Sequence, residues 1–252
     1  MGLRQRIGHG LARFLSCDRP GLSDGPTSDI SALTRAIRPG DVLLVEGTSR
    51  FSTAIKYLTQ STWSHAALCT RGGSRPRLVE ADVSEGVRSI SLDLYGGYHT
   101  RLCRPVSLSD HDLQAVIQYM ERRVGNQYDL RHIIDLARYL FPAPPVPTRW
   151  RRRLLTLGSG EPTRAICSSL IAQAFQSVHY PILPVMEHWP TPCSGVPNHS
   201  QMTARPRHHT LFTPRDFDIS PFFQIVKPAL ENGFSPYEIP WVEAIRSEGN
   251  AD

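Results

Sequence analysis

Short apolar runs separated by turn residues dominate the first half of the chain. The run Val42-Leu-Leu-Val45 follows the turn Arg38-Pro-Gly-Asp41 and is predicted to form a buried strand. Four further runs, also bounded by turn signals, predict strands at residues 62–69, 77–81, 86–90 and 99–104. Because these strands are short, closely spaced and joined by turns, we expect an antiparallel sheet.

Apolar residues spaced three or four positions apart predict helices in four other segments. These segments are residues 49–59, 109–124, 129–140 and 163–178. In the last of them Thr163 is a plausible N-cap, and Leu170, Ile171 and Phe175 belong to one apolar face. The elements together predict an α+β fold, in which a small antiparallel sheet packs against helices.

Three stretches depart from this pattern and set the predicted domain boundaries. Residues 1–37 combine a basic amphipathic segment with a linker rich in Gly, Ser, Pro and Asp. The Pro-rich and Arg-rich residues 141–162 exclude a helix and predict an insertion or long loop. We therefore expect one domain at residues 38–228, followed by a C-terminal tail at residues 229–252.

Length and charge narrow the class of protein. With 252 residues, of which 40% are hydrophobic, the chain is long enough to bury a full core in one domain. The net charge of +5 permits an anionic partner but does not require one. The basic run Arg149–Arg153 is more typical of a solvated surface than of an anion site, and no aromatic-interleaved groove accompanies it. We expect no nucleic-acid partner.

The cysteines and histidines of the chain indicate in which cellular compartment the protein works and whether it binds a metal ion. The five cysteines form no CxxC pair and no disulfide framework, which favours a reducing compartment such as the cytoplasm. No apolar run is long enough to span a bilayer. Residues 1–20 leave three alternatives: a helix at the surface of the inner membrane, a helix packed on the domain, or a frayed terminus. The His-rich residues 181–209 lack a metal-ligand spacing and predict a polar surface loop. We expect no metal and no cofactor.

Cys167 lies in the first turn of the helix predicted at residues 163–178. Free backbone N–H groups and the positive end of the helix dipole lower the pKa of a thiol in such a position and favour the thiolate. One of those N–H groups can also polarise a substrate carbonyl. A buried, inert thiol is the more common role of a lone cysteine, so its position alone does not decide between core and nucleophile.

A cysteine nucleophile needs a histidine to accept its proton and a third group to orient that histidine. His65 lies within a predicted strand, where packing would favour an apolar residue, and Glu80 lies in the next strand. Adjacent antiparallel strands can bring both side chains to one sheet face. Spacing alone is equally compatible with a chance arrangement.

Five motifs, in their order along the chain, resemble those of the YiiX/YebB-like proteins, which are circularly permuted papain-like cysteine hydrolases of the NlpC superfamily. The motifs are RPGDVLLV at 38–45, WSHAAL at 63–68, LVEA at 78–81, GNQYD at 125–129 and ICSSLI at 166–171. The resemblance covers residues 38 to about 228. It implies a permuted papain-like fold, in which the histidine-bearing sheet precedes the nucleophile helix.

The same resemblance implies roles for individual residues. Cys167 would be the nucleophile, His65 the general base and Glu80 the residue that orients the histidine. Tyr128 would be an aromatic residue of the substrate pocket, although a tyrosine packed at a helix start is an equal alternative, and Ser64 would bind substrate beside the base.

The substrate implied by the resemblance is an amide of the peptide, isopeptide or cell-wall (peptidoglycan-derived) peptide type, hydrolysed through an acyl-enzyme. A lipid-directed acyltransferase or thioesterase, similar to the lecithin:retinol acyltransferase-like enzymes, is the alternative that the basic N-terminus favours. A catalytically silent binding module is a third. The complete Cys, His and Glu set argues against it, because binding does not need that trio.

Overall fold

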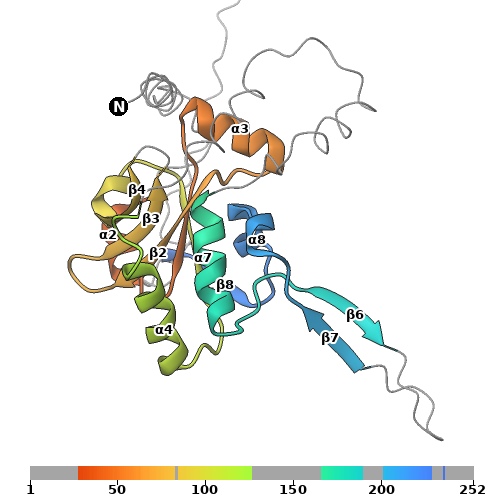
Figure 1. The fold of residues 1–252 in the computed structure, drawn as a ribbon. Helices are drawn as coiled ribbons and strands as arrows, with labels where there is room; N and C mark the ends of the chain where they lie inside the picture. Colours follow the sequence, from red (N-terminus) through yellow and green to blue (C-terminus); the bar gives the residue numbers. More distant parts are fainter. Residues whose placement is uncertain (1–27, 83–84, 127–165, 190–200, 229–234, 236–252) are drawn as a thin grey trace, which may run out of the picture.

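A six-stranded antiparallel sheet organises the chain (Figure 1), with the strand order β4-β3-β2-β1-β5-β8. The computed structural model describes residues 28–82, 85–126, 166–189, 201–228 and 235. The strands of the sheet are β1 (Val42–Val45), β2 (His65–Arg71), β3 (Arg77–Asp82), β4 (Gly86–Ser91), β5 (Thr100–Pro105) and β8 (Phe223–Val226). Every neighbouring pair is antiparallel, which confirms the predicted sheet type.

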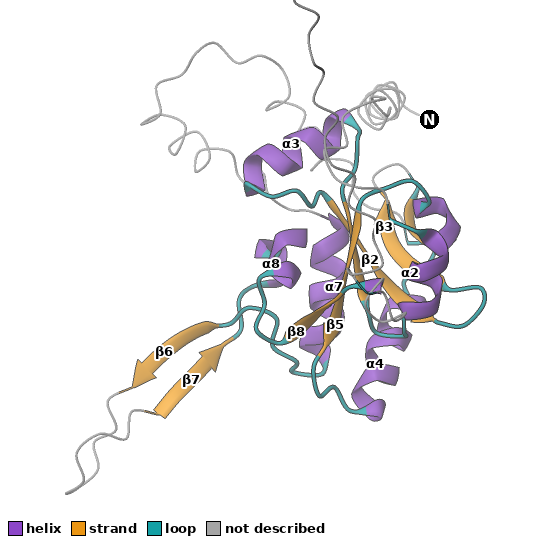
Figure 2. Ribbon diagram, turned by 180° about the vertical axis from the view of Figure 1, so that it is seen from behind, coloured by secondary structure: helices purple, strands orange, loops and turns teal. Residues whose placement is uncertain are grey.

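Helices cover both faces of this sheet. Figure 1 shows two of them, α4 and α7, in front of the sheet, and Figure 2, seen from behind, shows α2 on the opposite face. The helices are α2 (Ile30–Ala36), α3 (Arg50–Thr59), α4 (Asp110–Glu121), α7 (Ile166–Ser177) and α8 (Pro214–Asp218), with short 3-10 helices η1 (Leu92–Tyr95) and η2 (His209–Leu211). The fold is therefore of the α+β class.

Strand alternation divides the core into two apolar clusters. Ala66 and Leu68 of β2 belong to the cluster that contains the apolar residues of α4 and α7, whereas Ala67 and Cys69 belong to the cluster formed with α2 and η1. Because helices cover both faces of the sheet, β1 is buried along its whole length. This explains why all four of its residues are apolar.

Serine caps fix the start of two helices near the sheet. The Ser49 hydroxyl accepts a hydrogen bond of 3.0 Å from the Ser52 N–H at the start of α3. At the start of α4, the Ser109 hydroxyl likewise accepts a hydrogen bond of 3.1 Å from the Asp112 N–H. The capped helices begin within one residue of their predicted starts, at Arg50 and Asp110. In the described part of the chain, no helix has the length and apolar character needed to cross a bilayer.

Two features differ from the sequence-based expectations. Helix α2 lies in the segment assigned to the N-terminal linker, but Asp29 caps it and Leu33 is buried against the sheet. Strands β6 (Val185–Trp189) and β7 (Gln201–Arg205) pair with each other where a polar loop was expected. They form a hairpin that extends from the body of the molecule (Figure 1), so their backbone groups are satisfied locally rather than by the main sheet.

Several predictions fall outside the described residues. These are the amphipathic segment at residues 1–20, the helix at 129–140, the insertion at 141–162 with its arginine run, and nearly all of the tail at 229–252. Membrane contact, the insertion and the domain boundaries stay predictions.

Candidate active site

His65 and Glu80 form a close side-chain pair. His65 Nε2 lies 2.7 Å from Glu80 Oε2, while the Glu80 side chain is only 1% exposed and that of His65 is 24% exposed. The predicted contact between these two residues is therefore present, with the histidine on the solvent side.

The strand register explains why the pair meets. Glu80 lies opposite Ala67 in the β2–β3 ladder, so His65, two residues earlier in β2, is its diagonal neighbour on the same sheet face. That face carries η1, because the flanking Val79 and Ala81 point to the α7 side. His65 is the first residue of β2, so its ring lies at the end of the sheet.

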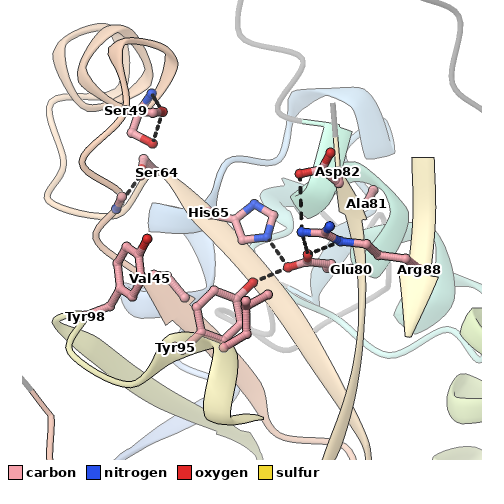
Figure 3. A pocket seen from close by; sticks show the side chains of 13 residues that line it. Val45, Ser49, Ser64, His65, Glu80, Ala81, Asp82, Arg88, Tyr95 and Tyr98 are labelled. Atoms are coloured by element: carbon pink, nitrogen blue, oxygen red, sulfur yellow. Dashed lines mark hydrogen bonds and ion pairs between the residues drawn. The ribbon is translucent and has the colours of Figure 1, made fainter. Parts of the chain in front are cut away.

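Two further side chains hold the Glu80 carboxylate (Figure 3). Arg88 lies directly across from Glu80 in the β3–β4 ladder, and its Nε and Nη2 atoms are each 2.8 Å from Oε1. The Tyr95 hydroxyl, which comes from η1, donates to Oε2, the oxygen that also contacts His65. Every oxygen of this buried carboxylate is thus hydrogen-bonded, as a charge removed from water requires.

These partners keep Glu80 ionised. Burial by itself raises the pKa of the carboxyl, but the hydrogen bonds and charge of His65, followed by the contacts with Tyr95 and Arg88, lower it to about 2. Next to the carboxylate, the pKa of Tyr95 is raised well above its ordinary value, first by burial and then by the Glu80 charge. Tyr95 therefore stays a neutral hydrogen-bond donor.

Cys167 is the second group that acts on His65. Burial lowers the pKa of His65, but the charge of Cys167 and a hydrogen bond with it, together with Glu80, raise that pKa well above its ordinary value. Because Nε2 is occupied by Glu80, Nδ1 is the ring nitrogen left for the thiol. The raised pKa favours the protonated form of His65.

The start of α7 is fixed by its neighbours. Cys167 is the second residue of this helix and is 5% exposed, whereas the two other described cysteines, Cys69 and Cys103, are fully buried. The adjacent Ser168 is also fully buried, and its hydroxyl donates to the Phe212 carbonyl at 2.7 Å. This bond ties the first turn of α7 to η2 and so restrains the position of the thiol.

A second histidine–carboxylate pair lies at the same end of the sheet. His99 Nδ1 is 3.0 Å from Glu46 Oε2, but the other oxygen of Glu46 is bound by Lys56 Nζ at 2.9 Å. The pair therefore joins α3 to the ends of β1 and β5 as an ion cluster. His65 is the histidine whose pKa responds to Cys167.

A cavity of about 270 Å³ opens beside His65. One end is formed by the His65–Glu80–Arg88 group and the other by serine hydroxyls, with an apolar wall between them. The lining comprises Val45, Gly47, Ser49, Ser52, Ser64, His65, Glu80, Ala81, Asp82, Arg88, Leu94, Tyr95 and Tyr98. The charged groups of this cavity are paired with one another, which suits a neutral ligand better than a charged one.

Ser64, predicted to bind substrate, lines this cavity and has a structural contact as well. Its hydroxyl oxygen accepts a hydrogen bond of 2.9 Å from the Gly47 N–H. A Cβ on Gly47 would lie 2.2 Å from Ser52 Oγ and 2.9 Å from Ser64 Oγ, so only glycine fits between these hydroxyls without movement. The serines and the glycine together shape one end of the cavity.

The structure thus brings three of the five predicted site residues into contact and places a fourth, Ser64, on the cavity wall. Tyr128 lies outside the described residues. Within the described part of the chain, no group of three or more His, Cys, Asp or Glu side chains is arranged to hold a metal ion.

Arg88 and Tyr95 were missed by the sequence reasoning. The alternation of β4, with Val87 and Ile90 buried, gives no sign that Arg88 faces a buried partner. Pairing the predicted strands end to end, residues 77–81 with 86–90, would place Arg88 opposite Val79, whereas the observed register, with Asp82 opposite Gly86, places it opposite Glu80.

No protein-family model matches the chain, and a search of curated proteins found no match. The structure is similar to the crystal structure of the metalloprotein YiiX from Escherichia coli O157:H7, with 17% sequence identity and a TM-score of 0.46, over 75% of this chain and 96% of that chain. At this identity no residue role follows from the likeness.

Proposed function

We propose that this protein is a cysteine hydrolase that cleaves an amide bond through an acyl-enzyme on Cys167. The observation that supports the proposal is that His65 interacts with both groups: its Nε2 lies 2.7 Å from Glu80 Oε2, and Cys167 raises its pKa. His65 and Glu80 precede Cys167 in the chain, and the proposal includes the permuted papain-like arrangement that the sequence motifs imply.

In the proposed reaction, Cys167 begins as a thiolate and His65 as an imidazolium, and the two form a thiolate–imidazolium pair. The Cys167 sulfur attacks the substrate carbonyl carbon and forms a tetrahedral oxyanion, which accepts hydrogen bonds from backbone N–H groups in the first turn of α7. The oxyanion then collapses, the C–N bond breaks, and His65 transfers its proton to the leaving amine. This step leaves a thioester on Cys167 and a neutral imidazole.

Water completes the reaction. His65 accepts a proton from a water molecule, whose oxygen attacks the thioester carbonyl, and the C–S bond breaks to release the carboxylic acid and restore the thiolate–imidazolium pair. Throughout, Glu80 accepts a hydrogen bond from Nε2 and keeps Nδ1 directed at the sulfur.

The cavity beside His65 favours a small, neutral substrate group. Its volume of about 270 Å³ lies below the roughly 300–1,000 Å³ that is typical of pockets for drug-sized ligands. The Ser49, Ser52 and Ser64 hydroxyls offer neutral hydrogen bonds, and Leu94, which is 52% exposed, offers apolar contact at the wall. An amino-acid residue of a peptide meets these conditions better than a long acyl chain, so we favour the amide over the lipid-directed alternative.

The test is the pH dependence of iodoacetamide labelling at each cysteine of the native protein, measured by mass spectrometry. We expect Cys167 to label fastest, because a paired thiolate is reactive at a pH where a free thiol, with a pKa of about 8.5, is not. Cys69 serves as an internal control, since burial raises its pKa to about 12. Cys167→Ser is expected to abolish turnover of peptide amides while the fold is kept.

A matched pair of histidine variants sharpens the test. His65→Ala is expected to remove the labelling advantage of Cys167, whereas His99→Ala, which also removes a histidine bound to a carboxylate, is expected to leave it unchanged. Slow labelling of Cys167 at every pH, or equal effects of the two variants, would contradict the proposed function.

A further inference from the structure

The ionic contacts around Glu80 continue past the proposed catalytic residues to the surface. Arg88 binds Glu80 through two nitrogens, and its Nη1 lies 2.7 Å from Glu85 Oε2, while its Nη2 lies 3.5 Å from Asp82 Oδ2. Asp82 in turn accepts a hydrogen bond of 2.9 Å from the Glu85 N–H. A single guanidinium thus joins the buried carboxylate to two acidic residues where β3 ends and β4 begins.

The two oxygens of Glu80 have separate tasks. Oε2 receives His65 and the Tyr95 hydroxyl, and Oε1 receives Arg88. If Arg88 were removed, Oε1 would lose the guanidinium that now holds it, in a side chain that is 1% exposed. The carboxyl group would then gain by turning Oε1 toward the remaining donors, and turning moves Oε2 away from His65.

The guanidinium itself is held in one orientation. Its planar fork presents donors in fixed directions, and contacts with three carboxylates use both edges of the fork. The Arg88 side chain is 29% exposed and Glu85 is 63% exposed, so the outer contacts are screened by solvent whereas the inner contact with Glu80 is not.

We propose that Arg88 is a positioning residue of the active site: by holding Oε1 of Glu80 it fixes Oε2 on Nε2 of His65 and so directs Nδ1 at Cys167. This role rests on the proposed function and extends it to a fourth residue.

A purely structural salt bridge between β3 and β4 is the competing account, and the two accounts differ in their pH dependence. The titratable groups in contact with Glu80 or Arg88 are His65, Asp82, Glu85 and Tyr95, and Cys167 acts on His65 and Tyr95. An Arg88→Gln variant loses the ion pairs of Arg88 with Glu80, Asp82 and Glu85, and keeps the contacts of Glu80 with His65 and Tyr95. Because burial then opposes ionisation of Glu80 with one partner fewer, its pKa rises, and the acid limb of the activity profile moves to higher pH.

The experiment compares Arg88→Gln and Arg88→Lys with Arg77→Gln. Arg77 is the matched control, because it belongs to the same strand pair and donates to Ser89 instead of Glu80. For Arg88→Gln we expect kcat/KM to fall about 10- to 100-fold, as for a misplaced catalytic group, with the acid limb moved to higher pH. Arg88→Lys keeps the charge but loses the fork, so it should retain the wild-type acid limb and recover only part of the rate.

A second readout does not depend on turnover. The proton on His65 Nε2, bound to a buried carboxylate, should give a low-field imidazole resonance in the proton NMR spectrum, assigned by its loss in His65→Ala. We expect this resonance to disappear or shift in Arg88→Gln and to stay unchanged in Arg77→Gln. If Arg88→Gln does not fold, Arg88→Lys supplies the same comparison, since loss of the fork alone should move the resonance.

The outcomes separate this inference from the proposed function. Wild-type protein without turnover but with an Arg88-dependent resonance would refute the hydrolase and keep Arg88 as the residue that positions Glu80. Turnover in the wild type with an unchanged resonance and pH profile in Arg88→Gln would overturn the role of Arg88 and leave the hydrolase standing.

Discussion

The buried Glu80 carboxylate should make folding stability sensitive to acid, and Glu80→Gln should remove that sensitivity. The pKa of Glu80 lies at about 2 instead of the ordinary 4.5. At about 1.36 kcal/mol per pH unit, this displacement corresponds to a stabilisation of about 3 kcal/mol by the ionised form. The free energy of unfolding therefore contains a large contribution from one side chain.

The difference between the folded-state and unfolded-state pKa of Glu80 determines how the free energy of unfolding changes with pH. The folded-state pKa is lower than the unfolded-state value, so the contribution is fully present above about pH 4.5 and is lost as the pH falls toward 2. Between pH 7 and pH 3 the protein should lose about 2 kcal/mol from this group, because the unfolded state is almost fully protonated at pH 3 and the folded state is not.

Urea unfolding at pH 7 and pH 3 measures this loss. Wild-type protein should lose about 2 kcal/mol more than Glu80→Gln between the two pH values, since glutamine does not titrate. Glu85→Gln is the control, because Glu85 also binds Arg88 but is 63% exposed, and its pH dependence should match the wild type. Equal losses in the wild type and Glu80→Gln would refute the electrostatic account of the site.

Two further predictions concern the scaffold around the site. Gly47→Ala should lower the free energy of unfolding by about 1–3 kcal/mol, because the new Cβ would lie 2.2 Å from Ser52 Oγ and one of the two must move. Ser168→Ala should cost about 1–3 kcal/mol in the same urea assay, since it leaves the buried Phe212 carbonyl without its donor. Ser169→Ala is the control for the second variant: the Ser169 hydroxyl has no hydrogen-bond partner among the described residues, so its loss should cost little.

The secondary structure was predictable wherever side-chain periodicity was strong. The run at residues 42–45 became β1 with the predicted ends, and the strands and helices predicted between residues 49 and 124 occur within about three residues of their expected starts and ends. The pattern failed at α2, where a Pro- and Gly-rich context suggested a linker, and at the β6–β7 hairpin, where neighbouring prolines masked two short strands.

The His65–Glu80 contact was accessible to sequence reasoning, because adjacent antiparallel strands place residues at diagonal positions on one face. The contacts of Arg88 and Tyr95 with Glu80 could not be predicted from the sequence. They depend on the pairing of β3 with β4 and on the position of η1 against the sheet, and neither follows from the residue types themselves.

The sequence by itself determined which residues form strands and helices, because backbone hydrogen bonding and burial impose periods of two and 3.6 on the positions of apolar side chains. It also determined the chemistry on offer: a thiol in a first helical turn, an imidazole and a carboxylate. Only the tertiary structure decided that the start of α7 meets the start of β2, about 100 residues earlier in the chain. The position of Cys167 near His65 depends on how α7 packs across the sheet. Many apolar contacts between residues far apart in the sequence set this packing, so the local pattern of apolar and polar residues does not predict it.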